Sequence, residues 1–262
     1  AEYLCRMEAT LFSRFLSYVE IKTKITSIFA FLLSLSYLFS VGQTIDVGRT
    51  AIFFAAMFLF DLTTTAINNY VDTGNSGAPL QFGRKAALAI IILLFIVSAG
   101  LGILLAAVTD LVVLLLGGAC FLFGVLYSYG PVPISGQPWG EFFSGLFYGL
   151  FIPFLILYIN MPAGTYFTYN LSFETIDLSL RVTPILTVLL LSVAPFCVTA
   201  NIMLANNTCD VERDIVVKRH TLPYYIGHKA LYLFAGLYYL TYLSIIAMVA
   251  LRMLSPICLI SL

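Results

Sequence analysis

Long apolar runs separated by short polar stretches dominate the chain. The runs cover residues 21–42, 50–69, 86–108, 111–129, 140–160, 182–206, 229–250 and 253–262. All but the last are about as long as the ~20 residues that a helix needs to cross a bilayer. They lack the period-two alternation of membrane β-strands. The pattern therefore predicts an all-α polytopic membrane protein, with one transmembrane helix for each run.

The composition supports this interpretation. Of the 262 residues, 61% are hydrophobic and 10% are charged, whereas a soluble domain carries about 25% charged residues. The formal net charge is zero, so nothing in the charge balance suggests a nucleic-acid partner. The first 20 residues contain several charges of both signs and do not match a cleaved signal peptide. We interpret residues 1–262 as one domain in the lipid bilayer.

Lysine and arginine residues between the runs predict the orientation in the cell membrane. With the N-terminus inside, the outer side holds Arg49, Arg181 and Arg252. The inner side holds the other basic residues, which are Arg6, Arg14, Lys22, Lys24, Arg84, Lys85, Arg213, Lys218, Arg219 and Lys229. This bias places the segment 161–181 outside, as an interfacial hairpin or a short helix. It places the ends of the second and sixth runs at the cytoplasm.

Two polar stretches of similar spacing end the second and sixth runs. Asn68 and Asp72 are four residues apart, and Asn206, Asp210 and Asp214 follow the same interval. This spacing puts each set on one helical face. Mg²⁺ commonly binds one or two carboxylates together with substrate phosphates. One such stretch alone would fit a solvated helix end, but two at one membrane face favour a site for Mg²⁺ and a diphosphate.

Asp61 lies on the same helical face as Asn68 and Asp72, deeper in the second apolar run. An acid inside a membrane helix usually faces a cavity or a partner. Asp61 is therefore either a site residue or a structural hydrogen-bond partner of a neighbouring helix. Residues 127–140 are rich in Pro and Gly, which excludes a helix. They form either a structured turn over the site or a plain connection between helices.

Basic residues flank both polar stretches. They are Lys22 and Lys24 before the first, Arg84 and Lys85 after it, and Lys218 and Arg219 after the second. Arginine and lysine commonly bind phosphate oxygens. The positive-inside bias alone also explains each of these residues.

The stretches 61–72, 126–135, 140–141 and 206–222 together resemble the UbiA superfamily of intramembrane aromatic prenyltransferases. The likeness runs from Lys22 to the seventh run, and it is greatest to the enzymes that act on 1,4-dihydroxy-2-naphthoate. The resemblance implies a bundle of eight to nine transmembrane helices around a central cavity that opens toward the membrane. It also implies Mg²⁺ and the diphosphate at the cytoplasmic end.

The resemblance further implies roles for individual residues. It implies that the metal ligands are Asp72, Asp210 and Asp214. It implies that the substrate-binding residues are Asn68, Asn206, Arg84, Lys218, Arg219 and Lys22, with Lys22 at the mouth of the cavity. Tyr127 matches the tyrosine that opens the family's loop between the fourth and fifth spans and is a candidate catalytic residue. Asp61 and Asp72 are candidates for the base that activates the acceptor.

The expected reaction is a Mg²⁺-dependent transfer of a polyprenyl chain from polyprenyl diphosphate to 1,4-dihydroxy-2-naphthoate. Carbon dioxide and diphosphate leave, which gives demethylmenaquinone, a step of menaquinone biosynthesis. One alternative is the same chemistry on another aromatic acceptor, such as 4-hydroxybenzoate. The other alternative is a membrane transporter, whose site would lie nearer the middle of the membrane.

Two features depart from the family's pattern. The family usually has another acid four residues after Asp72, where this chain has Ser76. The sequence also ends inside the eighth apolar run, so a ninth helix is absent from residues 1–262. The first departure weakens the case for a second metal at that end.

Overall fold

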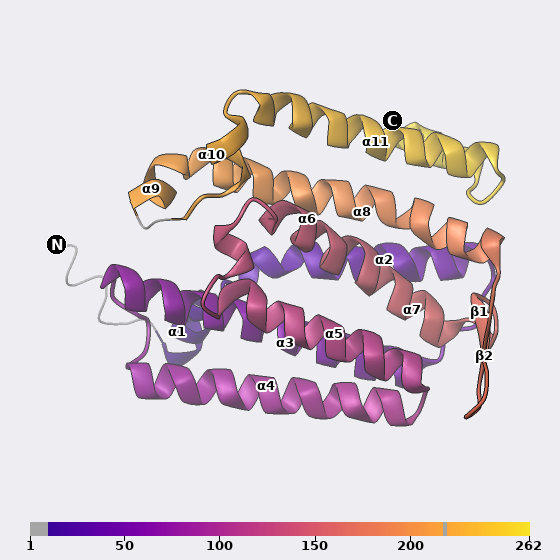
Figure 1. Ribbon diagram of the computed structural model, residues 1–262, viewed down its shortest axis with the longest axis horizontal. Coiled ribbons are helices and arrows are strands. Elements are labelled where there is room, and N and C mark those ends of the chain that lie inside the picture. Colours follow the sequence, from indigo (N-terminus) through magenta and orange to yellow (C-terminus); the bar gives the residue numbers. More distant parts are fainter. Residues whose placement is uncertain (1–9, 217–218) are drawn as a thin grey trace.

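The structure, a computed structural model, describes residues 10–216 and 219–262. Long helices run side by side along the longest axis of the molecule (Figure 1). In chain order the elements are α1 (Leu11–Tyr18), η1 (Ile21–Lys24), α2 (Ile25–Ser40), α3 (Val47–Ser76), α4 (Arg84–Ala107), α5 (Leu111–Ser128), η2 (Ile134–Gly136), α6 (Gly140–Ser144), η3 (Gly145–Phe151), α7 (Ile152–Asn160), β1 (Phe167–Leu171), β2 (Ile176–Leu180), α8 (Val182–Cys209), α9 (Val211–Val216), α10 (Leu222–Ile226), α11 (Lys229–Ala250) and η4 (Pro256–Ser261).

Seven helical segments of the described chain are long and apolar enough to cross a membrane. They are Ile21–Ser40, Val47–Gly74, Arg84–Ala107, Leu111–Ser128, Gly140–Asn160, Val182–Cys209 and Lys229–Ala250. Large apolar side chains face outward on them; Leu93 of α4, for example, is 64% exposed. Such surfaces suit contact with lipid. The helical membrane fold predicted from the apolar runs is thus confirmed, with seven of the eight predicted runs forming spans.

The eighth predicted run, 253–262, does not form a span. The chain turns after α11, where Arg252 has a φ of 57°. Pro256 then opens the 3₁₀ helix η4, whose first turn is capped by the hydroxyl of Ser255. This helix is six residues long, far short of the ~20 that a span requires. Met253 and Leu254 instead pack against the buried core, which accounts for part of the segment's apolar character.

α3 carries the first polar stretch within one continuous helix. The side chain of Asp46 caps its first turn by accepting the N–H of Arg49 at 2.9 Å. The helix ends at Gly77, whose φ of 68° suits a left-handed C-terminal cap. α3 therefore extends beyond the predicted limit of residue 69, and Asn68 and Asp72 lie in its last turns.

The second polar stretch is broken, so the prediction of one helical stripe from Asn206 to Asp214 is wrong. α8 ends at Cys209, and Asp210 is its C-cap with φ −102° and ψ 5°. These angles leave the α region, so α9 starts as a separate helix at Val211. One hydrogen bond of 2.8 Å, from the N–H of Asp214 to the carbonyl of Asp210, still bridges the break.

Helix pairs and two buried clusters hold the bundle together. α3 packs along α4, α8 packs along α11, and α2 packs along α7. Tyr18 of α1 is fully buried and donates a hydrogen bond of 3.0 Å to the carbonyl of Ala66 on α3. Burial raises the pKa of Tyr18 to about 12, which favours the protonated phenol that makes this contact.

Residues 161–181 form a hairpin, the first of the two predicted alternatives. β1 and β2 pair antiparallel, with Tyr169 opposite Leu178. Figure 1 shows the hairpin at one end of the bundle and α1, α9 and α10 at the other. The two polar stretches therefore lie at the end opposite to the hairpin, as the loop charges predicted.

Candidate active site

Two adjoining hollows open between the helices. The larger encloses about 630 Å³ and is lined by residues of η1, α2, α3, α4, α5, η2, α6, η3, α7 and α8. The smaller encloses about 490 Å³ and is lined by the end of α3, residues within 131–137, and Asp210, Arg213, Asp214 and Arg219. Ser128, Ser135, Asp210 and Arg219 line both hollows. Two of the polar residues predicted from the sequence, Asp210 and Arg219, thus lie where a largely apolar cavity meets a polar pocket.

Arg219 joins the two acidic helix ends. Its Nη1 lies 3.5 Å from Asp72 Oδ2, and its Nε lies 3.6 Å from Asp214 Oδ1. Its Nη2 donates a hydrogen bond of 3.1 Å to the carbonyl of Ser135. Asn68 adds a hydrogen bond of 3.1 Å to Asp72 Oδ2. Because Arg219 is about three-quarters buried, these contacts lie in a partly dry environment that strengthens them.

Asp210 and Asn206 lie at the boundary of the larger cavity. Both residues line it, and Asp210 pairs with the exposed Arg213 at 3.3 Å. Such a surface pair contributes little to stability. The neighbouring Asn207 is buried instead and donates a hydrogen bond of 2.8 Å to Glu141 Oε1. Of the two adjacent asparagines, Asn206 therefore faces the cavity and Asn207 ties α8 to α6.

The donor set at this end suits a hard divalent cation. Among the described residues, no three His, Cys, Asp or Glu side chains gather closely enough to hold a metal by themselves. Mg²⁺ does not need such a cage, because it commonly takes one or two carboxylates and completes its shell with water and phosphate. The carboxylates of Asp72, Asp210 and Asp214, all at the walls of the smaller hollow, fit a metal of that kind.

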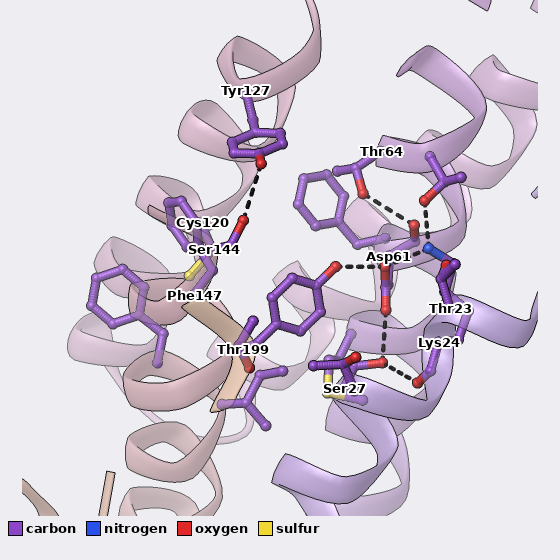
Figure 2. Close-up of a pocket in the computed structure, with 18 of the residues that line it drawn as sticks. Thr23, Lys24, Ser27, Asp61, Thr64, Cys120, Tyr127, Ser144, Phe147 and Thr199 are labelled. Atoms are coloured by element: carbon purple, nitrogen blue, oxygen red, sulfur yellow. Dashed lines mark hydrogen bonds and ion pairs between the residues drawn. The ribbon is translucent and has the colours of Figure 1, made fainter. Parts of the chain in front are cut away.

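Asp61 is the centre of a buried polar cluster in the wall of the larger cavity (Figure 2). Its Oδ1 lies 2.8 Å from Lys24 Nζ, and the two side chains are 5% and 3% exposed. Ser27 donates to its Oδ2 at 2.7 Å, and the hydroxyl of Tyr148 donates to its Oδ1 at 2.8 Å. Lys24 also donates to Thr65. The cluster ties η1, α2, α3 and η3 together, and its two charges cancel.

Tyr127 stands on the other side of the same cavity (Figure 2). Its hydroxyl lies 3.0 Å from Ser144 Oγ, and both residues line the cavity. The segment that follows, η3, is a π-helix, a widened turn that is frequent at functional sites. Phe147 and Tyr148 are adjacent in this helix, yet both line the cavity.

Residues 129–139 form a structured turn, which decides between the two predicted alternatives. The prediction that no helix forms within 127–140 is wrong at its ends, because Tyr127 and Ser128 close α5 and Gly140 begins α6, and the turn itself contains the 3₁₀ helix η2. Ser135 is buried and its carbonyl accepts from Arg219. The carbonyl of Gly136 accepts the N–H of His220 at 3.0 Å. The turn is therefore bound to the segment after α9 and forms a wall of the smaller hollow.

The structure does not bring every predicted site residue to the cavities. Arg84 is exposed and lines neither hollow; its guanidinium stacks 4.1 Å from the ring centroid of Tyr70. Lys22 is also exposed and lines neither hollow, because the 3₁₀ turn of η1 directs Lys24 inward instead. Lys218 lies outside the described residues. These placements leave Arg219 and Lys24 as the Lys or Arg residues that line the larger cavity within the described chain.

Sequence reasoning missed Tyr148 and Ser27. Tyr148 lies in a run of Phe, Gly and Leu residues that reads as an ordinary span, and Ser27 opens α2 without any motif. The lone aspartate at position 61 was the available signal, because a buried acid requires hydrogen-bond donors around it.

Comparisons with known proteins agree with this architecture. The sequence model described as "UbiA prenyltransferase family" matches residues 27–262. The 1,4-dihydroxy-2-naphthoate octaprenyltransferase of Bacillus subtilis (strain 168) is 26% identical over 219 residues, which is 79% of this chain and 64% of that protein. The chain thus spans less than two thirds of that relative's length.

Solved structures share the fold at low identity. A UbiA homolog from Archaeoglobus fulgidus, bound to DMAPP and Mg²⁺, superposes with a TM-score of 0.65 at 14% identity, covering 95% of this chain and 84% of that one. A digeranylgeranylglyceryl phosphate synthase superposes with a TM-score of 0.61 at 18% identity, covering 92% and 78%.

Proposed function

The chain belongs to the UbiA prenyltransferase family, and from this premise we propose that it transfers a polyprenyl chain from polyprenyl diphosphate to 1,4-dihydroxy-2-naphthoate. Diphosphate and carbon dioxide leave in the reaction. The observation that carries the proposal is that the two hollows share four lining residues: a pocket lined by three carboxylates and Arg219 adjoins a cavity with largely apolar walls. A polyprenyl diphosphate has the same division into a charged head and an apolar tail.

The polar pocket would hold the diphosphate. Asp72, Asp210 and Asp214 are the residues that would hold Mg²⁺, and the bound metal would neutralise charge on the leaving diphosphate. Arg219 presents a fork of N–H donors that suits phosphate oxygens. Asn68 orients Asp72 through the hydrogen bond between their side chains. The protein's own part is thus to bind the diphosphate and to stabilise the charge that develops on it.

The apolar cavity would hold the prenyl chain and exclude water. Its lining includes Phe53, Phe60, Phe147 and Phe151. Aromatic faces attract cations, so such walls favour the positive charge that develops on the allylic carbon. The exclusion of water also protects this carbon from hydrolysis. Tyr127, whose hydroxyl is tied to Ser144, adds another aromatic ring near the junction of the hollows.

The positive charges at the larger cavity limit where the carboxylate of the acceptor can bind. Lys24 is already paired with Asp61 at 2.8 Å, so its positive charge is compensated. A carboxylate in a dry site needs a cation. Arg219, the other Lys or Arg that lines the larger cavity among the described residues, is likewise paired with Asp72 and Asp214. The acceptor carboxylate would therefore share one of these two cations with the acids that already bind it.

Membranes that contain the protein, incubated with a polyprenyl diphosphate and a panel of aromatic acids with and without EDTA, test the proposal. We expect prenylated 1,4-dihydroxy-2-naphthoate, much less product from 4-hydroxybenzoate, and no product in EDTA. A preference for 4-hydroxybenzoate would overturn the naphthoate assignment and keep the chemistry. Absence of product with every acceptor would overturn the proposed transfer to an aromatic acid.

A further inference from the structure

We propose that Tyr148 and Asp61 form a proton relay that takes the hydroxyl proton of the aromatic acceptor during transfer. Tyr148 would contact the acceptor hydroxyl, and Asp61 would receive the proton through Tyr148. The inference rests on the proposed transfer to an aromatic acceptor, and it assigns a catalytic role to Tyr148, which belongs to neither polar stretch of the sequence.

The hydrogen-bond direction at Tyr148 leaves its oxygen able to accept. The hydroxyl donates its one proton to Asp61 Oδ1 at 2.8 Å, and a phenolic oxygen keeps its acceptor capacity when it donates. Tyr148 lines the larger cavity. A donor in the cavity, such as the hydroxyl of a phenolic ring, complements this oxygen. The free hydrogen-bonding capacity of Tyr148 therefore matches the one group that must lose a proton.

The partners of Asp61 favour access through Tyr148. Oδ1 already accepts from both Lys24 and Tyr148, and Oδ2 accepts from Ser27. A carboxylate oxygen has about two acceptor sites, so Oδ1 is saturated. Asp61 is also 6% exposed. An acceptor hydroxyl reaches this carboxylate most directly by way of the tyrosine oxygen.

The relay is separate from the metal-binding end. Asp61 and Asp72 are both on α3, and their spacing of 11 residues corresponds to about 16 Å along a helix. Arg219 pairs with Asp72 and Asp214 but not with Asp61, whose ion pair is with Lys24. Asp61 is thus held for a task other than diphosphate binding.

Close helix packing fixes the position of Tyr148. It lies in the π-helix η3 beside Gly149, where an added Cβ would come within 2.2 Å of the backbone of Phe196 on α8. This contact leaves η3 little freedom to shift. Asp61 is fixed from the other side by Lys24 and Ser27. A relay requires such fixed donor and acceptor geometry, because proton transfer proceeds along a hydrogen bond.

The proposed transfer breaks one bond of the prenyl carbon and forms another. The bond between the prenyl carbon and the diphosphate oxygen breaks, and its electron pair leaves with the diphosphate. The ring carbon that carries the carboxylate bonds to the prenyl carbon, while the neighbouring hydroxyl loses its proton and the electron pair of its O–H bond completes a C=O group. The released proton passes to the Tyr148 oxygen, and the Tyr148 proton passes to Asp61. Carbon dioxide then leaves from the prenylated ring carbon, and the electron pair of the broken C–C bond restores the aromatic ring. The C=O oxygen takes a proton back from Tyr148, and Asp61 returns its proton to Tyr148. A ring hydroxyl becomes strongly acidic once a cation has attacked the ring, so a carboxylate already paired with Lys24 still accepts the proton.

Three hydroxyl deletions test the relay in the membrane-bound protein. Tyr148→Phe and Ser27→Ala each remove one hydroxyl donor from Asp61, but only the first removes the proposed contact with the acceptor. Tyr158→Phe is the matched control: the hydroxyl of Tyr158 donates to Asp110 in an equivalent tyrosine–aspartate pair, and neither residue lines the hollows. The readouts are kcat, the KM for prenyl diphosphate, and the melting temperature.

We expect kcat to fall about 100-fold or more in Tyr148→Phe, as for the loss of an acid–base group, while the KM for prenyl diphosphate stays within twofold. Ser27→Ala should lose less than about tenfold, as for one hydrogen bond, and Tyr158→Phe should match the wild type. The relay is wrong if Tyr148→Phe retains kcat within threefold of Ser27→Ala. Absence of turnover in the wild type would instead contradict the proposed function.

Discussion

The guanidinium of Arg219 lies 3.5 Å from the carboxylate of Asp72, although the two residues come from opposite halves of the chain. The same group lies 3.6 Å from Asp214. The two acidic stretches are therefore parts of one site, and a substrate that binds between them would contact both halves of the protein.

Arg219 should control the binding of the diphosphate. Replacing it with Met removes charge-assisted hydrogen bonds of about 1.5–3 kcal/mol, so the KM for prenyl diphosphate should rise about 10- to 100-fold. Arg219→Lys should restore part of the loss, because the charge returns without the fork geometry. Arg49→Gln, at the other end of α3, is the control. An unchanged KM in Arg219→Met would exclude this role.

The three acids of the smaller hollow should each be needed for metal-dependent turnover. We expect Asp72→Ala, Asp210→Ala and Asp214→Ala to lose about 100-fold or more in kcat/KM, and EDTA to abolish activity until Mg²⁺ is restored. Asp177→Ala, on the exposed hairpin strand β2, is the control and should leave kcat/KM unchanged. Full activity in EDTA would contradict the metal site.

The buried pair of Lys24 and Asp61 should matter for stability as well as for turnover. Asp61→Ala leaves an ammonium group buried without its counter-charge, which costs about 3–5 kcal/mol. The double variant Lys24→Met/Asp61→Leu removes both charges and should recover most of that stability but not the activity. Melting temperatures in detergent measure the first effect and kcat the second. Equal melting temperatures for wild type and Asp61→Ala would show that the pair does not stabilise the fold.

Gly149 should tolerate no larger side chain. A Cβ there would lie 2.2 Å from the Phe196 backbone, so Gly149→Ala should force η3 away from α8 and destabilise the protein by about 1–3 kcal/mol. Gly100→Ala on α4 is the matched control, since an added Cβ meets nothing within 4 Å. That change should be neutral or stabilising. Equal melting temperatures for Gly149→Ala and Gly100→Ala would contradict this prediction.

The orientation predicted from the loop charges can be tested by labelling. In a variant without native cysteines, Ala78→Cys should resist an impermeant thiol reagent on intact cells. Glu174→Cys, in the hairpin turn, should react with it. The reverse pattern would place the candidate site outside the cell and overturn the positive-inside interpretation.

The features that the sequence predicted are local ones. Spans follow from runs of apolar residues, and the facing of Asn68 and Asp72 follows from a four-residue interval in one helix. The Lys24–Asp61 pair joins residues 37 apart on different elements, and no local pattern contains that information. The break at Asp210 and the π-helix at Tyr148 depend on how the helices pack. Both lie within or next to apolar runs, so hydropathy predicts neither of them.

Because the charges of Lys24 and Asp61 cancel, this pair contributes little to the electric field across the larger cavity. Two opposite charges 2.8 Å apart act at a distance as a small dipole, whose influence falls off faster than that of a single charge. The field felt by a molecule in the cavity therefore comes mainly from the end that holds Arg219 and the three carboxylates. A nitrile-labelled probe moved stepwise away from that end should report a stretching frequency that changes in one direction along the cavity.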